Sequence, residues 1–439
     1  MRVKLEITEA TLNTSGCVWC LMDGEWWKNL EIDLVIKTKN LYNKTMRHKS
    51  DQHAMLINII SFLGQLSMAT INLGLIFFMK TVFKLDPQSI GLFAAISALS
   101  YLAGILVLKK LVSAYPPPRT ILLSAIGMLF SGSAILIVKT SWSAFLLYAL
   151  YGLFMSFYWP PIMGWLSRNK EKKELGKSVS NFNLSWTWGL IAGPYIAGLL
   201  SGKSAAYAIE AAGVIMLIVV IILAAVSRKP SILAVSSNHD HKKAIKEQDT
   251  STYLRYACWV GLISGYFVFG ITMNIFPLYA QDVLHMPEST IGLLLLIRGL
   301  VTALIFMLMG KSHIWHFRFS SIMVFQGLLA ASLIIGLIAE SLILLIVFFI
   351  IFGVSFSGIY TISIFHGAAG SNDREHRMAV HEIMLTIGIV SGSFLGGVLY
   401  QRMSYSSVMI FCLIVTAAAA AAQFSVYLGK RASIKKLKL

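Results

Sequence analysis

The sequence predicts an all-α membrane protein of about twelve transmembrane helices. Of its 439 residues, 56% are hydrophobic and 13% are charged, and the mean hydropathy is +0.72. Soluble globular proteins contain about 25% charged residues. About twelve apolar runs follow Ala54, and each is long enough to cross a hydrocarbon core of about 30 Å. These runs lack the alternation of polar and apolar residues that is typical of transmembrane strands.

Short polar turns separate the runs, apart from one long polar linker in the middle of the chain. We expect a polar N-terminal tail at 1–53, six spans in 54–227, the linker at 228–255, six more spans in 256–428 and a basic tail at 429–439. The expected spans are 54–79, 90–112, 120–138, 143–166, 179–201, 205–227, 256–279, 290–310, 319–338, 342–364, 378–400 and 405–428.

The two sets of six spans resemble each other in sequence. Pro87-Gln-Ser-Ile-Gly-Leu matches Pro287-Glu-Ser-Thr-Ile-Gly-Leu, and Tyr151-Gly152 matches Phe352-Gly353. The spacing is 201 residues from Gly91 to Gly292 and from Gly152 to Gly353. We therefore predict two pseudo-symmetric six-helix bundles. Parallel repeats of six spans are a transporter architecture, with the substrate site between the halves near the bilayer midplane.

The net charge of +17 is distributed in a way that argues against nucleic-acid binding. If both termini are cytoplasmic, most basic residues fall on the cytoplasmic side, as the positive-inside rule requires. Lys170, Lys172 and Lys173 in one such loop are examples. The charge therefore sets orientation and attracts anionic lipid headgroups. We expect an integral protein of the plasma or inner membrane.

Small residues recur at helical spacing in two of the expected spans. Such stripes let helices approach closely in lipid, and Pro194 should kink the helix that contains it. The predicted helix-packing residues are Gly189, Gly193, Pro194 and Gly198 in the fifth span, and Gly388, Gly392 and Gly396 in the eleventh.

These features resemble the Major Facilitator Superfamily over nearly all of 54–428. The run Gly189-x-x-x-Gly193-Pro194-x-x-x-Gly198 is similar to the fifth-helix motif of its proton-coupled antiporters, with Ala197 where a glycine is usual. The resemblance implies alternating access driven by a proton or ion gradient. Two features depart from it: Leu102–Thr120 contains no acid, and the fourth span lacks the arginine of drug exporters.

Ionisable residues within spans are expensive and are functional candidates. Arg298 would either bind an anionic or hydrogen-bonding solute or form a structural ion pair. Glu382, next to His381, would either couple proton movement or lie at a helix start that favours a carboxylate. Glu210 lies near the end of a span that is peripheral in the superfamily and would either reach the interface or have a functional role.

The resemblance also implies which residues line a central cavity, because the first, fourth, seventh and tenth helices do so in the superfamily. Polar and aromatic side chains there would suit an amphipathic or ring-bearing solute, although each aromatic is also a candidate for packing. The candidates are Gln65, Asn72, Tyr158, Trp159, Asn274, Tyr360 and Thr361, joined by Asn183 and Trp186 of the fifth span.

Other function classes find little support. The sequence has no phosphate-binding GxxxxGK[ST] run and no HExxH, and Cys17 and Cys20 lack a second pair for a zinc site. We expect no cofactor, no metal and no enzyme activity. The predicted function is a monomeric secondary active transporter of a small organic solute, coupled to protons, with export favoured over import. The alternative is a membrane sensor or scaffold on the same fold.

Overall fold

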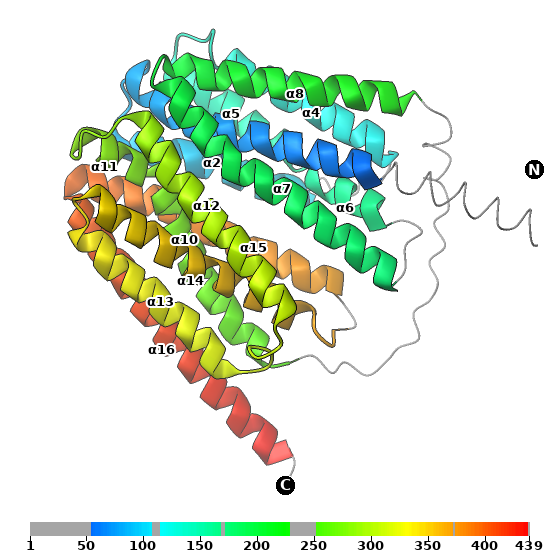
Figure 1. Cartoon of the computed structure of the whole chain (residues 1–439), viewed down its shortest axis with the longest axis vertical. Helices are drawn as coiled ribbons and strands as arrows, with labels where there is room; N and C mark the ends of the chain where they lie inside the picture. Colours follow the sequence, from blue (N-terminus) through cyan, green and yellow to red (C-terminus); the bar gives the residue numbers. More distant parts are fainter. Residues whose placement is uncertain (1–53, 108–114, 168–171, 229–251, 372–373, 438–439) are drawn as a thin grey trace, which may run out of the picture. The chain divides into compact units, whose positions relative to one another are not determined.

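A computed structural model describes residues 54–107, 115–167, 172–228, 252–371 and 374–437, and within these ranges no residue is in a strand (Figure 1). The predicted tail at 1–53, with Cys17 and Cys20, lies outside the described residues, as does most of the predicted linker. The first helix covers Ala54–Thr81. It is followed by α2 (Pro87–Val107), α4 (Pro117–Ala134), α5 (Ser141–Met155), α6 (Trp159–Ser167), α7 (Lys172–Ser201), α8 (Ala205–Ser227), α10 (Leu254–Asn274), α11 (Phe276–Asp282), α12 (Glu288–Lys311), α13 (Phe319–Ile338), α14 (Leu342–Ala368), α15 (Arg374–Arg402) and α16 (Tyr405–Leu437).

The helices confirm the predicted fold class. Within the described residues, ten helical segments are long and apolar enough to cross a membrane. The helices α4 and α7 occupy the positions expected for the third and fifth spans. The helix α16 runs on to Leu437, so it continues into the basic tail predicted at 429–439.

Two spans are interrupted where the sequence places prolines. The fourth span is divided between α5 and α6, with Pro160 and Pro161 in the first turn of α6. The seventh is divided between α10 and α11 at Ile275, two residues before Pro277. Proline has no N–H to donate and clashes with the preceding turn, so a helix breaks or restarts at such positions. In contrast, α7 continues through Pro194.

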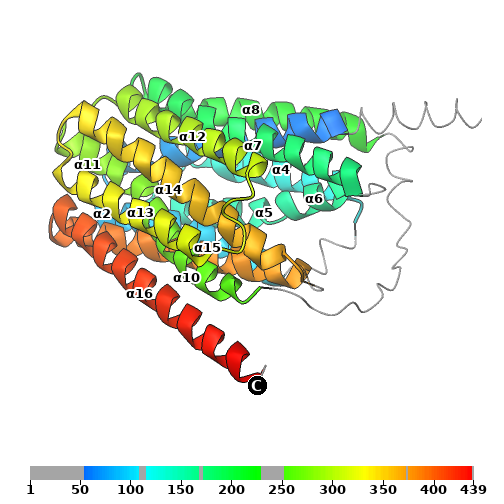
Figure 2. The same ribbon diagram turned by 60° about the horizontal axis from the view of Figure 1, so that its bottom comes forward.

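The helices that precede the linker pack against those that follow it along two seams. The helix α2 packs on α15, and α7 packs on α12. Within the second half, α10 packs on both α14 and α15, and the three lie side by side in Figure 2. The repeat is also visible in the backbone, because Lys84 (φ 55°) and His285 (φ 50°), 201 residues apart, occupy equivalent turns before α2 and α12.

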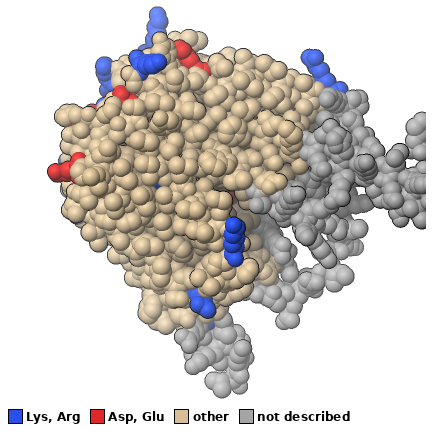
Figure 3. Space-filling view, in the orientation of Figure 1, with Lys and Arg blue, Asp and Glu red and all other residues tan. Residues whose placement is uncertain are grey.

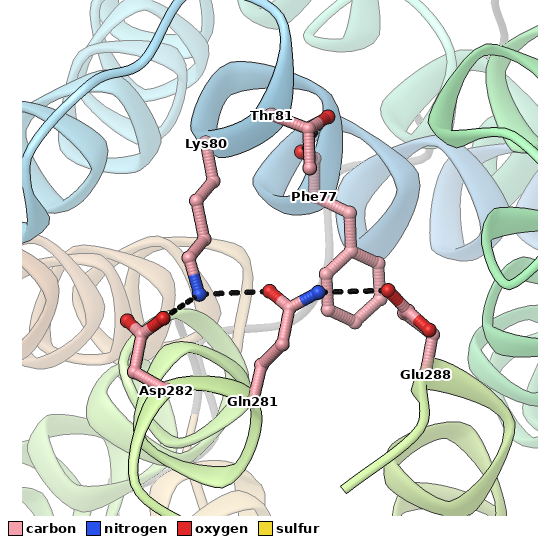
Figure 4. Close-up of polar contacts among 6 residues, drawn as sticks. All are labelled: Phe77, Lys80, Thr81, Gln281, Asp282 and Glu288. Atoms are coloured by element: carbon pink, nitrogen blue, oxygen red, sulfur yellow. Dashed lines mark hydrogen bonds and ion pairs between the residues drawn. The ribbon is translucent and has the colours of Figure 1, made fainter. Parts of the chain in front are cut away.

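A polar network joins the halves beside these turns. The Lys80 ammonium at the end of the first helix donates a hydrogen bond of 2.8 Å to Gln281 Oε1 and forms an ion pair with Asp282 (Figure 4). Gln281 Nε2 donates in turn to Glu288 Oε1 at 2.7 Å. We call Lys80, Gln281, Asp282 and Glu288 the Lys80 network, and this side of the helices the Lys80 end.

The outer surface is largely apolar. Large hydrophobic side chains such as Phe130, Ile218 and Ile343 are exposed. Charged side chains are few and scattered on the face that Figure 3 shows. Exposed apolar side chains are stable in hydrocarbon and costly in water, so this surface suits a lipid environment.

Candidate functional site

Arg298 lies within α12, and its side chain is only 2% exposed. Its Cζ atom is 4.9 Å from the centre of the Phe269 ring and 5.9 Å from that of Phe356. Its Nε atom is buried without a hydrogen-bond partner. No carboxylate in the described part of the chain forms an ion pair with it. Within a helix that can span the membrane, this guanidinium therefore has aromatic faces as its neighbours and no carboxylate partner among the described residues.

The rings around Arg298 form a continuous aromatic cluster from α10 and α14. Phe269 and Phe356 stack with their centres 4.9 Å apart, and Tyr266 lies 5.0 Å from Phe356. Tyr360 follows at 6.2 Å from Tyr266. We call Tyr266, Phe269, Phe356 and Tyr360 the aromatic cluster. Arg298 and the aromatic cluster therefore combine a cation, two phenyl rings and two phenol groups.

Glu382 lies on the α15 side of this cluster and is partly exposed. Its carboxyl group is close enough to interact electrostatically with Tyr266, Tyr360 and Tyr101. Tyr101 belongs to α2, so Glu382 lies at the seam between the two halves. Tyr266 also interacts electrostatically with Arg298. Arg298 and Glu382 thus share a tyrosine neighbour, while no ion pair joins them among the described residues.

His381 points to a different neighbour from Glu382. Its Nδ1 atom and the Ser363 hydroxyl of α14 are hydrogen-bonded at 3.1 Å, and its ring centre is 5.4 Å from that of Tyr360. The side chain is 1% exposed, and Nε2 has no partner. Adjacent residues on a helix point in directions about 100° apart, and the described structure gives no hydrogen bond between the imidazole and the Glu382 carboxyl.

Four other predicted lining residues lie on the first helix, on α10 and on α14. Asn72 is exposed although Ile71 and Leu73 are buried, and its Oδ1 accepts a hydrogen bond of 2.8 Å from the Tyr148 hydroxyl. Asn274 Nδ2 donates to Ser393 Oγ at 2.8 Å and to the Gly270 carbonyl at 3.0 Å, which ties α10 to α15. The other two, Gln65 and Thr361, are partly exposed.

Tyr158 departs from its predicted role as a solute contact. Its side chain is fully buried, and its hydroxyl donates a hydrogen bond of 2.8 Å to the Ile60 carbonyl of the first helix. Its ring lies over Gly64, where a Cβ atom would clash with it. Trp159 packs edge-to-face on Tyr158 at 5.2 Å. In this arrangement the buried Tyr158 hydroxyl has already donated its proton to the first helix, so the side chain packs there.

Asn183 and Trp186 interact with each other on α7. The indole Nε1 donates to Asn183 Oδ1 at 3.2 Å, one turn apart. Asn183 is exposed and Trp186 is partly exposed. The structure brings neither residue to the aromatic cluster by any contact that it describes.

The predicted packing glycines face three different helices. A Cβ atom on Gly189 would lie 2.5 Å from the Phe62 carbonyl oxygen, and one on Gly193 would lie 2.5 Å from Ala69 Cβ, both in the first helix. Gly198 and the Pro194 carbonyl face α12 instead. In α15, Gly388, Gly392 and Gly396 face α10 at Ile263, Phe267 and Ile271.

Sequence reasoning missed several members of the site, namely Tyr101, Tyr266, Phe269, Phe356 and Ser363. A usable signal was present in the spacing. Tyr266 and Phe269 are three residues apart, and Phe356 and Tyr360 are four apart, so each pair shares one face of its helix. Both pairs belong to spans expected to line the cavity.

The sequence profile of the Major Facilitator Superfamily matches residues 57–370. The chain belongs to the Major Facilitator Superfamily. It is a secondary transporter of this superfamily, which confirms the resemblance seen in the sequence. No curated protein matches the chain by sequence.

Solved structures of transporters share the fold at low identity. The nucleoside transporter NupG superposes with a TM-score of 0.66 at 14% identity, covering 85% of this chain and 99% of its own. A bacterial homologue of the human lysosomal transporter Spinster, in an inward-facing and unoccupied conformation, gives 0.68 at 12% identity, covering 86% and 96%. A POT family transporter in complex with 5-aminolevulinic acid gives 0.67 at 12% identity, covering 85% and 96%.

Proposed function

We propose that this superfamily member moves a small organic solute across the plasma or inner membrane by proton-coupled alternating access, with export favoured over import. The observation that carries the proposal is the place of Glu382. Its carboxyl group interacts electrostatically with Tyr101 of α2 and with Tyr360 of α14, two helices from opposite halves. A titratable group at a moving seam changes its surroundings with each conformation, and this links proton binding to the motion.

Contacts at the Lys80 end support an alternating mechanism. With both termini cytoplasmic, this end faces outward, and the Lys80 network together with the two glycine-lined seams closes it. Opening it would separate α2 from α15 and α7 from α12, and would break the ion pair between Lys80 and Asp282. The described conformation is then the one closed to the outside.

The solute would bind between the halves. Arg298 and Tyr360 offer charge and aromatic surface, while Asn72, Gln65, Asn274 and Thr361 offer amide or hydroxyl groups. We propose the same domain division as the sequence predicts, with bundles at 54–227 and 256–428. We propose a monomer in the lipid bilayer.

Flux measurements in proteoliposomes test the coupling role. A thermal-shift screen of the purified protein first selects a solute, and uptake of the labelled solute is then measured with and without a pH gradient. We expect Glu382→Gln to reduce gradient-driven net flux about tenfold or more while solute exchange continues. Glu210→Gln, at an exposed position of α8, is the matched control and should leave both unchanged.

The same measurements separate the competing functions. Equal loss of net flux and exchange in Glu382→Gln would contradict a coupling role. Solute binding by the wild type without any flux would contradict transport and would favour a sensor or scaffold on the transporter fold.

A further inference from the structure

We propose that Arg298 and the aromatic cluster form a site for a small organic monoanion, a single carboxylate on a flat or aromatic body. The proposal names the solute class and rests on the proposed function only for transport, since binding can be measured without flux. It starts from the missing partner of Arg298.

The guanidinium of Arg298 has no charged partner among the residues that the structure describes. Arginine keeps its charge in proteins, and a buried charge is stable only when it is paired and hydrogen-bonded. Here the guanidinium contacts the rings of Phe269 and Phe356, its Nε has no hydrogen-bond partner, and no described carboxylate pairs with it. The ligand that completes this environment carries the negative charge that the protein does not supply.

Helix packing does not require an arginine at this position. In the second half, a Cβ atom on Gly353 would lie 2.9 Å from the Arg298 carbonyl oxygen. In the first half, Gly152 of α5 meets the Ser97 carbonyl of α2 in the same way. Both pairs are separated by the 201-residue repeat, so Ser97 is the counterpart of Arg298. The backbone contact with the glycine forms equally well when the residue is serine, as in the first half. The arginine of the second half is therefore not needed for this helix packing.

The rings around Arg298 indicate what kind of molecule would carry the carboxylate. Phe269 and Phe356 lie nearly parallel, 18° apart, and cover the guanidinium. A flat solute can stack on such rings, and the planar guanidinium donates two parallel hydrogen bonds to a carboxylate. The carboxyl group of Glu382 also interacts electrostatically with Tyr266 and would repel a second negative charge. A monocarboxylate therefore fits better than a dicarboxylate.

Paired solutes that differ only in charge test the proposal on the purified full-length protein. The probes are benzoate against benzamide, indole-3-acetate against indole-3-acetamide, and acetate against acetamide, with benzylamine as a cation and phthalate as a dianion. Binding is followed by thermal shift and by competition at matched concentrations. We expect the aromatic monocarboxylates to stabilise the wild type and the amides, the amine and phthalate to have little effect.

Variants assign the preference to its residues. We expect Arg298→Gln to weaken benzoate binding about tenfold or more, as loss of a charge-assisted bidentate contact predicts, and Arg298→Lys to weaken it less. Phe269→Leu should weaken benzoate binding more than acetate binding. Arg119→Gln, which removes an exposed arginine of α4, is the control and should bind as the wild type does.

The comparison of carboxylates with amides on the wild-type protein tests the proposal even if Arg298→Gln does not fold. Absence of any preference for carboxylates over amides, preference for benzylamine, or unchanged benzoate binding by a folded Arg298→Gln would overturn the proposal. Flux distinguishes it from the proposed function. Carboxylate binding without flux would support the anion site and contradict the proposed transport function. Gradient-driven flux of a neutral solute without carboxylate binding would support transport and contradict the anion site.

Discussion

Gly292 of α12 lies so close to α7 that a Cβ atom on it would be 3.2 Å from Gly198 Cα and 2.7 Å from the Pro194 carbonyl oxygen. The other seam repeats this contact, because a Cβ atom on Gly91 of α2 would lie 3.2 Å from Gly397 Cα of α15. The two seams are therefore related by the internal repeat. Each places the first turns of one helix against the last turns of the other.

The first prediction follows from this close approach. Gly292→Ala places a methyl group against backbone atoms that cannot rotate away. We expect it to destabilise the described conformation by about 1–3 kcal/mol, the usual cost of overpacking. The measurement is the free energy of unfolding in mixed micelles, together with the distance between spin labels on α7 and α12.

Gly310→Ala provides the control on the same helix. Nothing lies within 4 Å of a Cβ atom at this position. Alanine has a higher helix propensity than glycine, so this variant should be as stable as the wild type or slightly more stable. If Gly292→Ala and Gly310→Ala lost the same free energy of unfolding, the close contact at Gly292 would not be the cause of the loss.

The second prediction concerns the Lys80 network. The side chains of Lys80 and Asp282 are 20% and 43% exposed, and ion pairs of this kind contribute about 0.2–1 kcal/mol. Lys80→Gln should therefore shift the population away from the conformation closed at the Lys80 end by at most about fivefold. Label distances across this end measure the shift.

High salt should reproduce part of this shift in the wild type, because it screens exposed charges. Lys139→Gln removes a more exposed lysine, outside the Lys80 network, and is the control. If both lysine variants give the wild-type population, the network does not bias the conformations.

The third prediction concerns pH and the turn between α12 and α13. The His316 ring stacks on Phe365 at 4.1 Å and lies 4.9 Å from His313. Partial burial, and then the charge of His313, lower the pKa of His316. A histidine with a lowered pKa in the folded state binds fewer protons than in the unfolded state, so its effect is to reduce stability as pH falls below about 6.5.

His316→Asn should remove this contribution. We expect its melting temperature to fall less than that of the wild type between about pH 7.5 and pH 5. His285→Asn is the control, because it replaces an exposed histidine at a positive-φ position that asparagine tolerates. A wild-type pH profile in His316→Asn would refute the prediction.

The fold was predictable from the sequence because its signals are local. Apolar runs give the spans, and prolines stand next to the breaks that the structure shows near Met155 and Ile275. The repeat from Gly91 to Gly292 gives the relation between the halves. The spans, the breaks and the repeat can be seen in composition and spacing along the chain, without knowledge of which helices pack together.

The candidate site was less predictable because it depends on which helix faces which. Arg298 was identified because a charge inside a span is conspicuous. Its neighbours Phe269 and Phe356 looked like ordinary packing residues. The direction of Tyr158 depends on how far the chain turns between α5 and α6, and the sequence shows the break without showing the turn. Tyr101 reaches Glu382 only because α2 packs on α15.

The last prediction separates packing from solute binding at Tyr158. Tyr158→Phe keeps the ring over Gly64 and removes the hydrogen bond to the Ile60 carbonyl, so we expect a loss of about 1 kcal/mol in the free energy of unfolding. Solute affinity, measured on the folded fraction, should not change, because the hydroxyl is buried and already bonded. Tyr207→Phe removes a hydroxyl from an exposed tyrosine of α8 and should change neither quantity. Weakened solute binding in Tyr158→Phe at unchanged stability would instead show that Tyr158 turns towards the solute in another conformation.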